Sequence, residues 1–168
     1  MTKTRIITQS AMLLAMALAI QSLRIIIPLP PIATMLIIGT GVNLVLLVLA
    51  YRVSMTSAVL IGTILPIVAF MQGQLPQIIF CPAVAIANII LVCLAKRWRG
   101  RPAVWLAPAA KAGVLLGLSN LIAEGIGLPP AVRHTILMMM GAGQLITATI
   151  ALILEKKLEK YIFCRKNC

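Results

Sequence analysis

The side chains best able to do chemistry are polar residues that stand inside long apolar runs. The chain is 61% hydrophobic with a mean hydropathy of +1.07, which is typical of integral membrane proteins. Lipid offers no hydrogen bonds, so each polar group in a membrane span needs a partner or a ligand. Lys111 stands out, because a cation near a helix centre costs about 2.5–3.5 kcal/mol on insertion scales. It either faces a cavity or a substrate anion, or it extends to the nearer headgroups. The set comprises Asn43, Asn88, Lys111, Asn120, Glu124 and Gln144.

Asn120 and Glu124 are four residues apart and therefore share one face of a helix. Glu124 is the only carboxylate outside the C-terminal tail, and the sequence contains no Asp. Its side chain can pair with Arg133, Arg24 or His134, or it can bind an amine or hydroxyl of a ligand. The uncharged amides can serve as hydrogen bonds between helices, worth about 0.6–2 kcal/mol each, or as ligand contacts.

Motifs for catalysis and metal binding are missing from the sequence. It has no P-loop, G-x-S-x-G or H-E-x-x-H motif, and no paired carboxylates within the apolar runs. We therefore expect no catalytic residues and no enzyme activity, so active movement of a solute would need energy from another subunit. Cys164 and Cys168 could hold a metal ion only with ligands that the sequence does not supply. No metal or cofactor is predicted.

Six apolar runs account for nearly the whole chain, and each is long enough to cross a bilayer. They predict an all-α integral membrane protein, a single domain over 1–168 with six transmembrane helices in a compact bundle. Pro66 predicts a kink near the end of the third run. The basic N-terminus also fits a signal peptide, although the first run continues past the cleavage point. The predicted spans are 6–27, 32–50, 53–71, 78–95, 104–122 and 135–154.

Basic residues mark one side of these helices. Most of the fifteen Lys and Arg residues fall in the termini and in the loops after the second and fourth spans. Short cytoplasmic loops are enriched in Lys and Arg, so both termini are predicted to be cytoplasmic. The net charge of +12 then reflects topology and anionic lipid rather than nucleic acid. The opposite loops are rich in Pro, Gly and neutral polar residues, which suits either plain solvent-facing turns or a place that holds a small molecule.

A stripe of small residues runs along the first span. Ala11, Ala15 and Ala19 share one helix face and allow another helix to approach closely. The partner helix could belong to this chain or to another protein, and the absence of an energy source in this chain favours another protein. Gly113 and Gly117 form G-x-x-x-G in the fifth span, where we expect close packing between helices of this chain.

Small residues in the fourth and sixth spans, Ala83 with Ala87 and Gly141 with Gly143, predict the same kind of packing. Three consecutive methionines, 138–140, precede the glycines of the sixth span. Consecutive residues point around a helix rather than toward one site, so membrane packing is favoured over a methionine-lined pocket.

This combination resembles the substrate-binding (S) components of energy-coupling factor (ECF) transporters, which import vitamins and related micronutrients in prokaryotes. The resemblance rests on 168 residues in six predicted helices and on the AMLLAMALA segment with its A-x-x-x-A spacing. QGQLPQ (72–77) and a lysine in the fifth span add weaker support. It implies a capture subunit in the prokaryotic cell membrane. Ala11, Ala15 and Ala19 would dock on a transmembrane coupling subunit attached to two ATPase subunits.

The resemblance also implies a small-molecule site near the outer face, and release of the substrate by toppling of the whole protein in the membrane. By position, the predicted substrate-binding residues are Gln74, Asn88, Lys111, Asn120, Glu124 and Gln144. The substrate stays open. The Trp and Tyr residues lie toward the inner side, unlike those of a site for thiamin or riboflavin.

Two other classes of protein stay open. A structural six-helix scaffold of the cell envelope would share this layout and need no ligand. An integral-membrane enzyme acting on lipid is disfavoured by the shortage of acidic and His residues. Copurification with a coupling subunit and ATPases would separate a transporter from a scaffold.

Overall fold

The computed structural model describes residues 2–27, 30–98, 100 and 102–166, without the side chains of residue 31 and residues 162–166. The side chains of Arg99, Arg101, Cys164 and Cys168 therefore lie outside the described part. Every regular element within that part is a helix, as predicted. In chain order these are α1 (Lys3–Ile26), α2 (Pro31–Val48), the π-helix η1 (Leu49–Val53), α3 (Met55–Met71), the 3₁₀-helix η2 (Ile78–Phe80), α4 (Cys81–Arg97), α5 (Ala103–Gly125), α6 (Pro130–Met138), the π-helix η3 (Met139–Gly143) and α7 (Gln144–Lys166).

Five helical stretches of the described chain are long and apolar enough to cross a membrane. They are Lys3–Ile26, Ile32–Val53, Ile78–Arg97, Ala103–Gly125 and Pro130–Tyr161. α3 is equally apolar in character but shorter, with 17 residues. At about 1.5 Å per residue it extends about 25 Å, near the lower limit for crossing a hydrocarbon core. Length and composition thus indicate a multi-pass membrane protein.

The end of the chain differs most from the predicted boundaries. The predicted spans 104–122 and 135–154 leave 123–134 as a loop, but α5 continues to Gly125 and α6 begins at Pro130. Proline suits a helix start, because its missing N–H falls where no helical acceptor exists. α6, η3 and α7 then follow one another without a break to Lys166, so the tail expected after 154 is helical. Leu, Glu and Lys, which fill that tail, are good helix formers.

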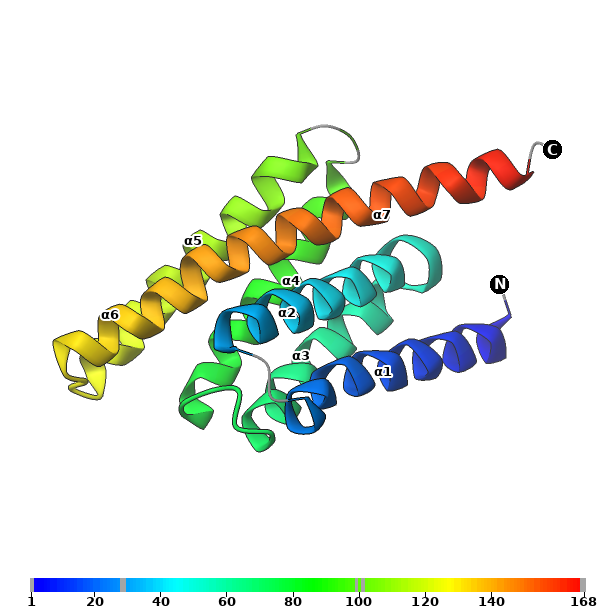
Figure 1. Ribbon diagram of the computed structural model, residues 1–168. Helices are drawn as coiled ribbons and strands as arrows, with labels where there is room; N and C mark the ends of the chain where they lie inside the picture. The colour runs from blue at the N-terminus through cyan, green and yellow to red at the C-terminus, as the bar shows by residue number, and fades with distance from the viewer. Residues whose placement is uncertain (1, 28–29, 99, 101, 167–168) are drawn as a thin grey trace.

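The helices run alternately up and down the bundle, and both termini lie at the same end (Figure 1). We call this the terminal end; it also carries η1, the end of α4 and the start of α5. The opposite, distal end carries the end of α1, the start of α2, the loop 72–77 and the α5–α6 connection. α4 packs between α3 and α5, α2 packs on α7, and α1 packs on α2 and α3.

Two clusters of buried apolar side chains fill the half of the bundle toward the terminal end. One cluster joins α1, α2, η1, α3 and α4, and a second joins α2, α4, α5 and α7. The second is built around Leu47, Leu91, Ala107, Ala148 and Leu152, all fully buried. Alanine at these positions lets neighbouring backbones approach closely, which is how helices associate in lipid.

α1 is peripheral to this core. Only 11% of its most apolar stretch is buried, compared with 39–44% for the other long helices. Ala17 faces the bundle, whereas Ala11, Ala15 and Ala19 are exposed. The small-residue stripe of α1 is therefore not packed against any other helix in the part of the chain that the structure describes.

The prediction that the glycine pairs pack closely against other helices is wrong for Gly113 and Gly117. Gly113 and Gly117 are exposed, and a Cβ added at either would meet nothing within 4 Å, so this G-x-x-x-G faces away from the bundle. Gly141 and Gly143 are buried, and a Cβ at each would lie 2.5 Å from a side-chain atom of a neighbouring helix. Ala83 also lies in the core. The spacing of small residues identifies a smooth face, but it does not say which way the face turns.

Candidate functional site

A cavity of about 220 Å³ occupies the distal half of the bundle. Its walls come from α1, α2, α3, the loop 72–77, α4, α5 and the continuous α6–η3–α7 segment. Exposed residues at its rim, including Arg24, Pro76 and Met139, belong to the distal end. Its polar lining comprises Gln21, Arg24, Thr34, Asn43, Gln74, Asn88, Lys111 and Gln144.

Lys111 lines this cavity and is only 1% exposed. Its Nζ donates to Asn43 Oδ1 at 2.6 Å and to Asn88 Oδ1 at 2.9 Å. The side chain therefore does not extend to the headgroups, and the alternative of a cavity-facing cation describes it. We call Lys111, Asn43 and Asn88 the floor of the cavity.

Both asparagines are held so that their oxygens face Lys111. Asn88 Nδ2 donates to the carbonyl of Gly62 at 3.2 Å. Gly62 stands four residues before Pro66, which has no N–H, so that carbonyl lacks its usual helical donor. Pro66, for which the sequence predicts a kink, thus frees an acceptor for Asn88. On the other side, Asn43 Nδ2 donates to Thr147 Oγ1 at 3.3 Å.

The three acidic side chains of the sequence all lie away from the floor. Glu124 pairs with Arg133, with 2.5 Å between Oε1 and the guanidinium nitrogen, and Glu155 pairs with Arg52 at 3.5 Å. Glu159, the third acidic residue of the sequence, is exposed one turn beyond Glu155 on α7. Within the described residues, the Lys111 ammonium therefore has neutral amide partners and no acidic side chain beside it.

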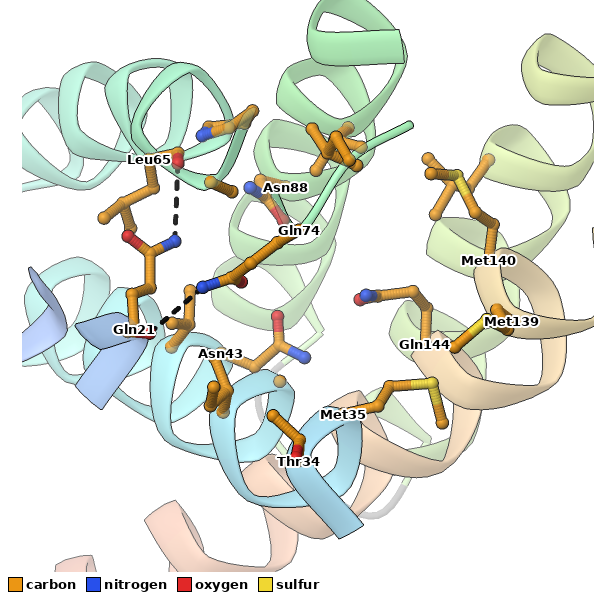
Figure 2. Close-up of a pocket in the computed structure, with 18 of the residues that line it drawn as sticks. Gln21, Thr34, Met35, Asn43, Leu65, Gln74, Asn88, Met139, Met140 and Gln144 are labelled. Atoms are coloured by element: carbon orange, nitrogen blue, oxygen red, sulfur yellow. Dashed lines mark hydrogen bonds between the residues drawn. The ribbon is translucent and has the colours of Figure 1, made fainter. Parts of the chain in front are cut away.

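The loop 72–77 is fastened over the distal end of α1. Gln74 Nε2 donates to the backbone carbonyl of Gln21 at 3.0 Å (Figure 2), and Gln72 Nε2 donates to Ser22 Oγ at 3.3 Å. Gly73, with φ of +68°, ends α3 in a left-handed residue that allows the N–H of Gln74 to bond back to the helix at Ala69. This turn aims Gln74 at the cavity.

Methionines form the wall opposite this loop. Met35, Met139 and Met140 line the cavity, and Gln144 points inward beside them (Figure 2). The expectation that the methionine run serves membrane packing alone is wrong for two of its three members. η3 begins at Met139, and its wider i→i+5 turns change the direction of the following side chains. Met138, outside η3, is 59% exposed.

Four of the six predicted site residues line this one cavity: Gln74, Asn88, Lys111 and Gln144. Asn120 and Glu124 do not line it. They share a helix face, as predicted, but that face turns to Arg133, which donates to Asn120 Oδ1 at 2.7 Å as well as to Glu124. Pairing with Arg133, the first of the alternatives for Glu124, is what the structure shows.

Several lining residues escaped the predicted site. Asn43 was recognised as a costly polar group but was not assigned to the site, although it accepts the shortest bond from Lys111. Gln21 and Thr34 stand near helix ends in the sequence, where polar residues are ordinary. No sequence signal marks Met35, whose place depends on how α2 turns against α7.

The arrangement is a chamber with a cationic floor, amide groups on its sides and a flexible apolar wall. It can bind a small molecule, and its described residues hold no cluster of His, Cys, Asp or Glu suited to a metal ion. A scan against protein-family models and searches of curated proteins and of solved structures find no match to this chain.

Proposed function

We propose that this protein is the membrane-embedded substrate-capture subunit of an ECF-type importer, binding a vitamin or related micronutrient. The cavity is the observation that carries the proposal. It opens at one end of a helical bundle and closes on a buried cation, and the other end is packed solid. A scaffold protein has no need of such a chamber, and a channel would need a path through the packed half.

In this proposal six helices cross the prokaryotic cell membrane, with the terminal end in the cytoplasm and the cavity facing outward. The charge distribution supports this orientation. η1 carries Arg52, α4 ends with Lys96 and Arg97, and α7 carries Lys156 and Lys157, all toward the terminal end. Cytoplasmic loops are enriched in such residues.

The exposed stripe of α1 supports docking on a transmembrane coupling subunit that carries two ATPases. Ala11, Ala15 and Ala19 present a smooth surface that no described helix covers. α1 contributes little to the core, so another helix can pack on its outer face without disturbing the cavity. Without a nucleotide-binding motif, the subunit would draw its energy from that complex.

The test is purification of the tagged full chain from native membranes, followed by mass spectrometry of the proteins that come with it. We expect a transmembrane subunit and ATPases with the wild type, and their loss with Ala15→Leu. Ala109→Leu makes the same change at an exposed position of α5 and should retain the complex. An unchanged complex with Ala15→Leu would refute docking through α1. Absence of ATPases from the wild-type complex would favour the scaffold class.

A further inference from the structure

We propose that the cavity binds a small monocarboxylate that carries no cationic group, with its carboxylate on Lys111 Nζ. The inference rests on the proposed function only in treating this ligand as the transported substrate. The chemistry of binding follows from the floor of the cavity and from the charges around it.

The first step concerns charge. Lys111 is buried, and the three acidic side chains of the sequence are all elsewhere: two in ion pairs with arginines and one exposed on α7. A buried cation without a counter-ion is costly, because neutral amides replace only part of its hydration. An anionic ligand supplies the charge that the chain itself does not place there.

The second step concerns the number of charges and hydrogen bonds. Lys111 spends two N–H groups on Asn43 and Asn88, and within the described chain its third carries no hydrogen bond. The floor thus offers one positive charge and one donor to a ligand. A carboxylate matches a single charge, whereas a phosphate dianion would bring a second charge into the same buried place. Arg24, the other cation of the lining, is exposed at the rim.

The third step concerns the rest of the ligand. No acidic side chain is among the lining residues that the structure describes, so an ammonium group, as in an amino acid, would lose its hydration without gaining a counter-ion. Met35, Met139 and Met140 offer a pliable apolar wall, and no aromatic side chain is among the described lining residues. The volume of about 220 Å³ is below the range of about 300–1,000 Å³ that holds drug-sized ligands.

Gln144 completes the set of ligand contacts. Its side chain points into the cavity between the methionine wall and Gln74 (Figure 2), and within the described residues its amide makes no hydrogen bond. A partly buried amide group without a partner is free to bond a ligand oxygen or hydroxyl. This contact would set the orientation of the ligand body above the carboxylate.

The experiment uses the purified full chain in lipid nanodiscs, with thermal unfolding and calorimetry as readouts. The probes are hexanoate, 3-(methylthio)propionate and 3-phenylpropionate, each compared with its own primary amide, and norleucine as the zwitterionic relative of hexanoate. We expect at least one carboxylate to bind, and its amide to bind at least about tenfold more weakly, or about 1.4 kcal/mol. Norleucine should bind more weakly than hexanoate.

The matched variants are Lys111→Met and Lys157→Met. Lys157 is exposed on α7, so its variant should bind the carboxylate as the wild type does, whereas Lys111→Met should lose binding. If Lys111→Met does not fold, the comparison of acid with amide on the wild-type protein decides. The proposal is overturned if an amide binds as tightly as the corresponding carboxylate, or if norleucine binds as tightly as hexanoate. It is also overturned if Lys111→Met binds normally, or if no carboxylate binds at about 10 mM.

Failure of this inference differs from failure of the proposed function. If the protein binds a carboxylate but purifies without ATPases, the proposed carboxylate site stands and the proposed transport function fails. If the protein purifies with ATPases but binds the amide more tightly than the carboxylate, the proposed transport function stands and the proposed carboxylate site fails.

Discussion

Replacing Asn88 by alanine removes two buried hydrogen bonds, and Pro66 makes one of them unusually important. Asn88 Nδ2 donates to the Gly62 carbonyl that Pro66 leaves without a helical donor, and Oδ1 accepts from Lys111 Nζ. A neutral bond contributes about 0.5–1.5 kcal/mol and one to a charged group about 1.5–3 kcal/mol. Hydrogen bonds between membrane helices average only about 0.6 kcal/mol. The membrane average sets the lower bound for the two bonds and the values for buried bonds set the upper one, so we expect Asn88→Ala to lower the free energy of unfolding by about 1–4 kcal/mol.

The origin of this cost can be isolated with Pro66→Ala. That change returns an N–H to α3, so the Gly62 carbonyl regains a donor from its own helix. In this background Asn88→Ala should lose chiefly its bond to Lys111. The double-mutant cycle should then show a coupling of about 1 kcal/mol. The free energies of the four proteins can be measured by titrating each with a denaturing detergent in bicelles.

Asn120→Ala is the control for this cycle. Asn120 also accepts hydrogen bonds from a cation, the half-buried Arg133. No carbonyl freed by a proline takes part in this contact. Its effect should add to that of Pro66→Ala within about 0.5 kcal/mol. Additive effects of Asn88→Ala and Pro66→Ala would refute the claim that the proline-freed carbonyl orients Asn88.

Two further changes test the outline of the cavity. A Cβ at Gly143 would lie 2.5 Å from Met35 Sδ, so Gly143→Ala must displace that flexible thioether. We expect this variant to bind the carboxylate several-fold more weakly, with little loss in the free energy of unfolding. Gly113→Ala is the control: its Cβ meets nothing within 4 Å, so affinity and stability should both stay unchanged. Glu124 is 53% exposed and bonds Arg133, so Glu124→Gln should cost less than about 1 kcal/mol in the free energy of unfolding and leave the calorimetric affinity unchanged. Loss of binding in Glu124→Gln would place that carboxylate in the site after all.

The helical elements were predictable because apolar run length directly limits what a chain can do in lipid. The fourth span is the clearest case: a polar loop before it and a basic loop after it bound the helix, which the structure places at Ile78–Arg97 including its first 3₁₀ turn. The predicted helix boundaries were wrong where a polar segment of the sequence is nevertheless helical. The segment after 154 loses its apolar character but keeps good helix formers, so hydropathy ends before the helix does.

The candidate site was partly predictable, because polar groups inside apolar runs are costly and therefore few. That argument singled out Lys111, Asn88 and Gln144. It did not bring Lys111 and Asn88 together, because their contact depends on how α4 and α5 rotate against each other. One clue lay in the spacing of Gly62 and Pro66, since a proline always frees the carbonyl four residues earlier in a helix.

The methionines escaped prediction for a geometric reason. Helical periodicity assigns directions by assuming 3.6 residues per turn throughout. A π-turn adds about one residue, which rotates everything beyond it by roughly 100° relative to that assumption. Met139 and Met140 lie in the π-helix η3, where the assumption of 3.6 residues per turn does not hold, and they line the cavity wall. No property of their side chains indicates this position in the sequence.

The asymmetry of the bundle restricts how a ligand could cross the membrane. Between Lys111 and the terminal end, the interior is closed by fully buried side chains: Leu47, Leu91, Ala107 and Leu152. A ligand that enters from the distal end and reaches the floor therefore meets a packed core rather than a continuing passage. Opening a path there would require separating α2, α4, α5 and α7, at the cost of their close packing. Under the proposed function, delivery to the other side follows more readily from movement of the whole bundle against a partner on α1. The exposed stripe of α1 and the solid terminal half thus support the same mode of transport.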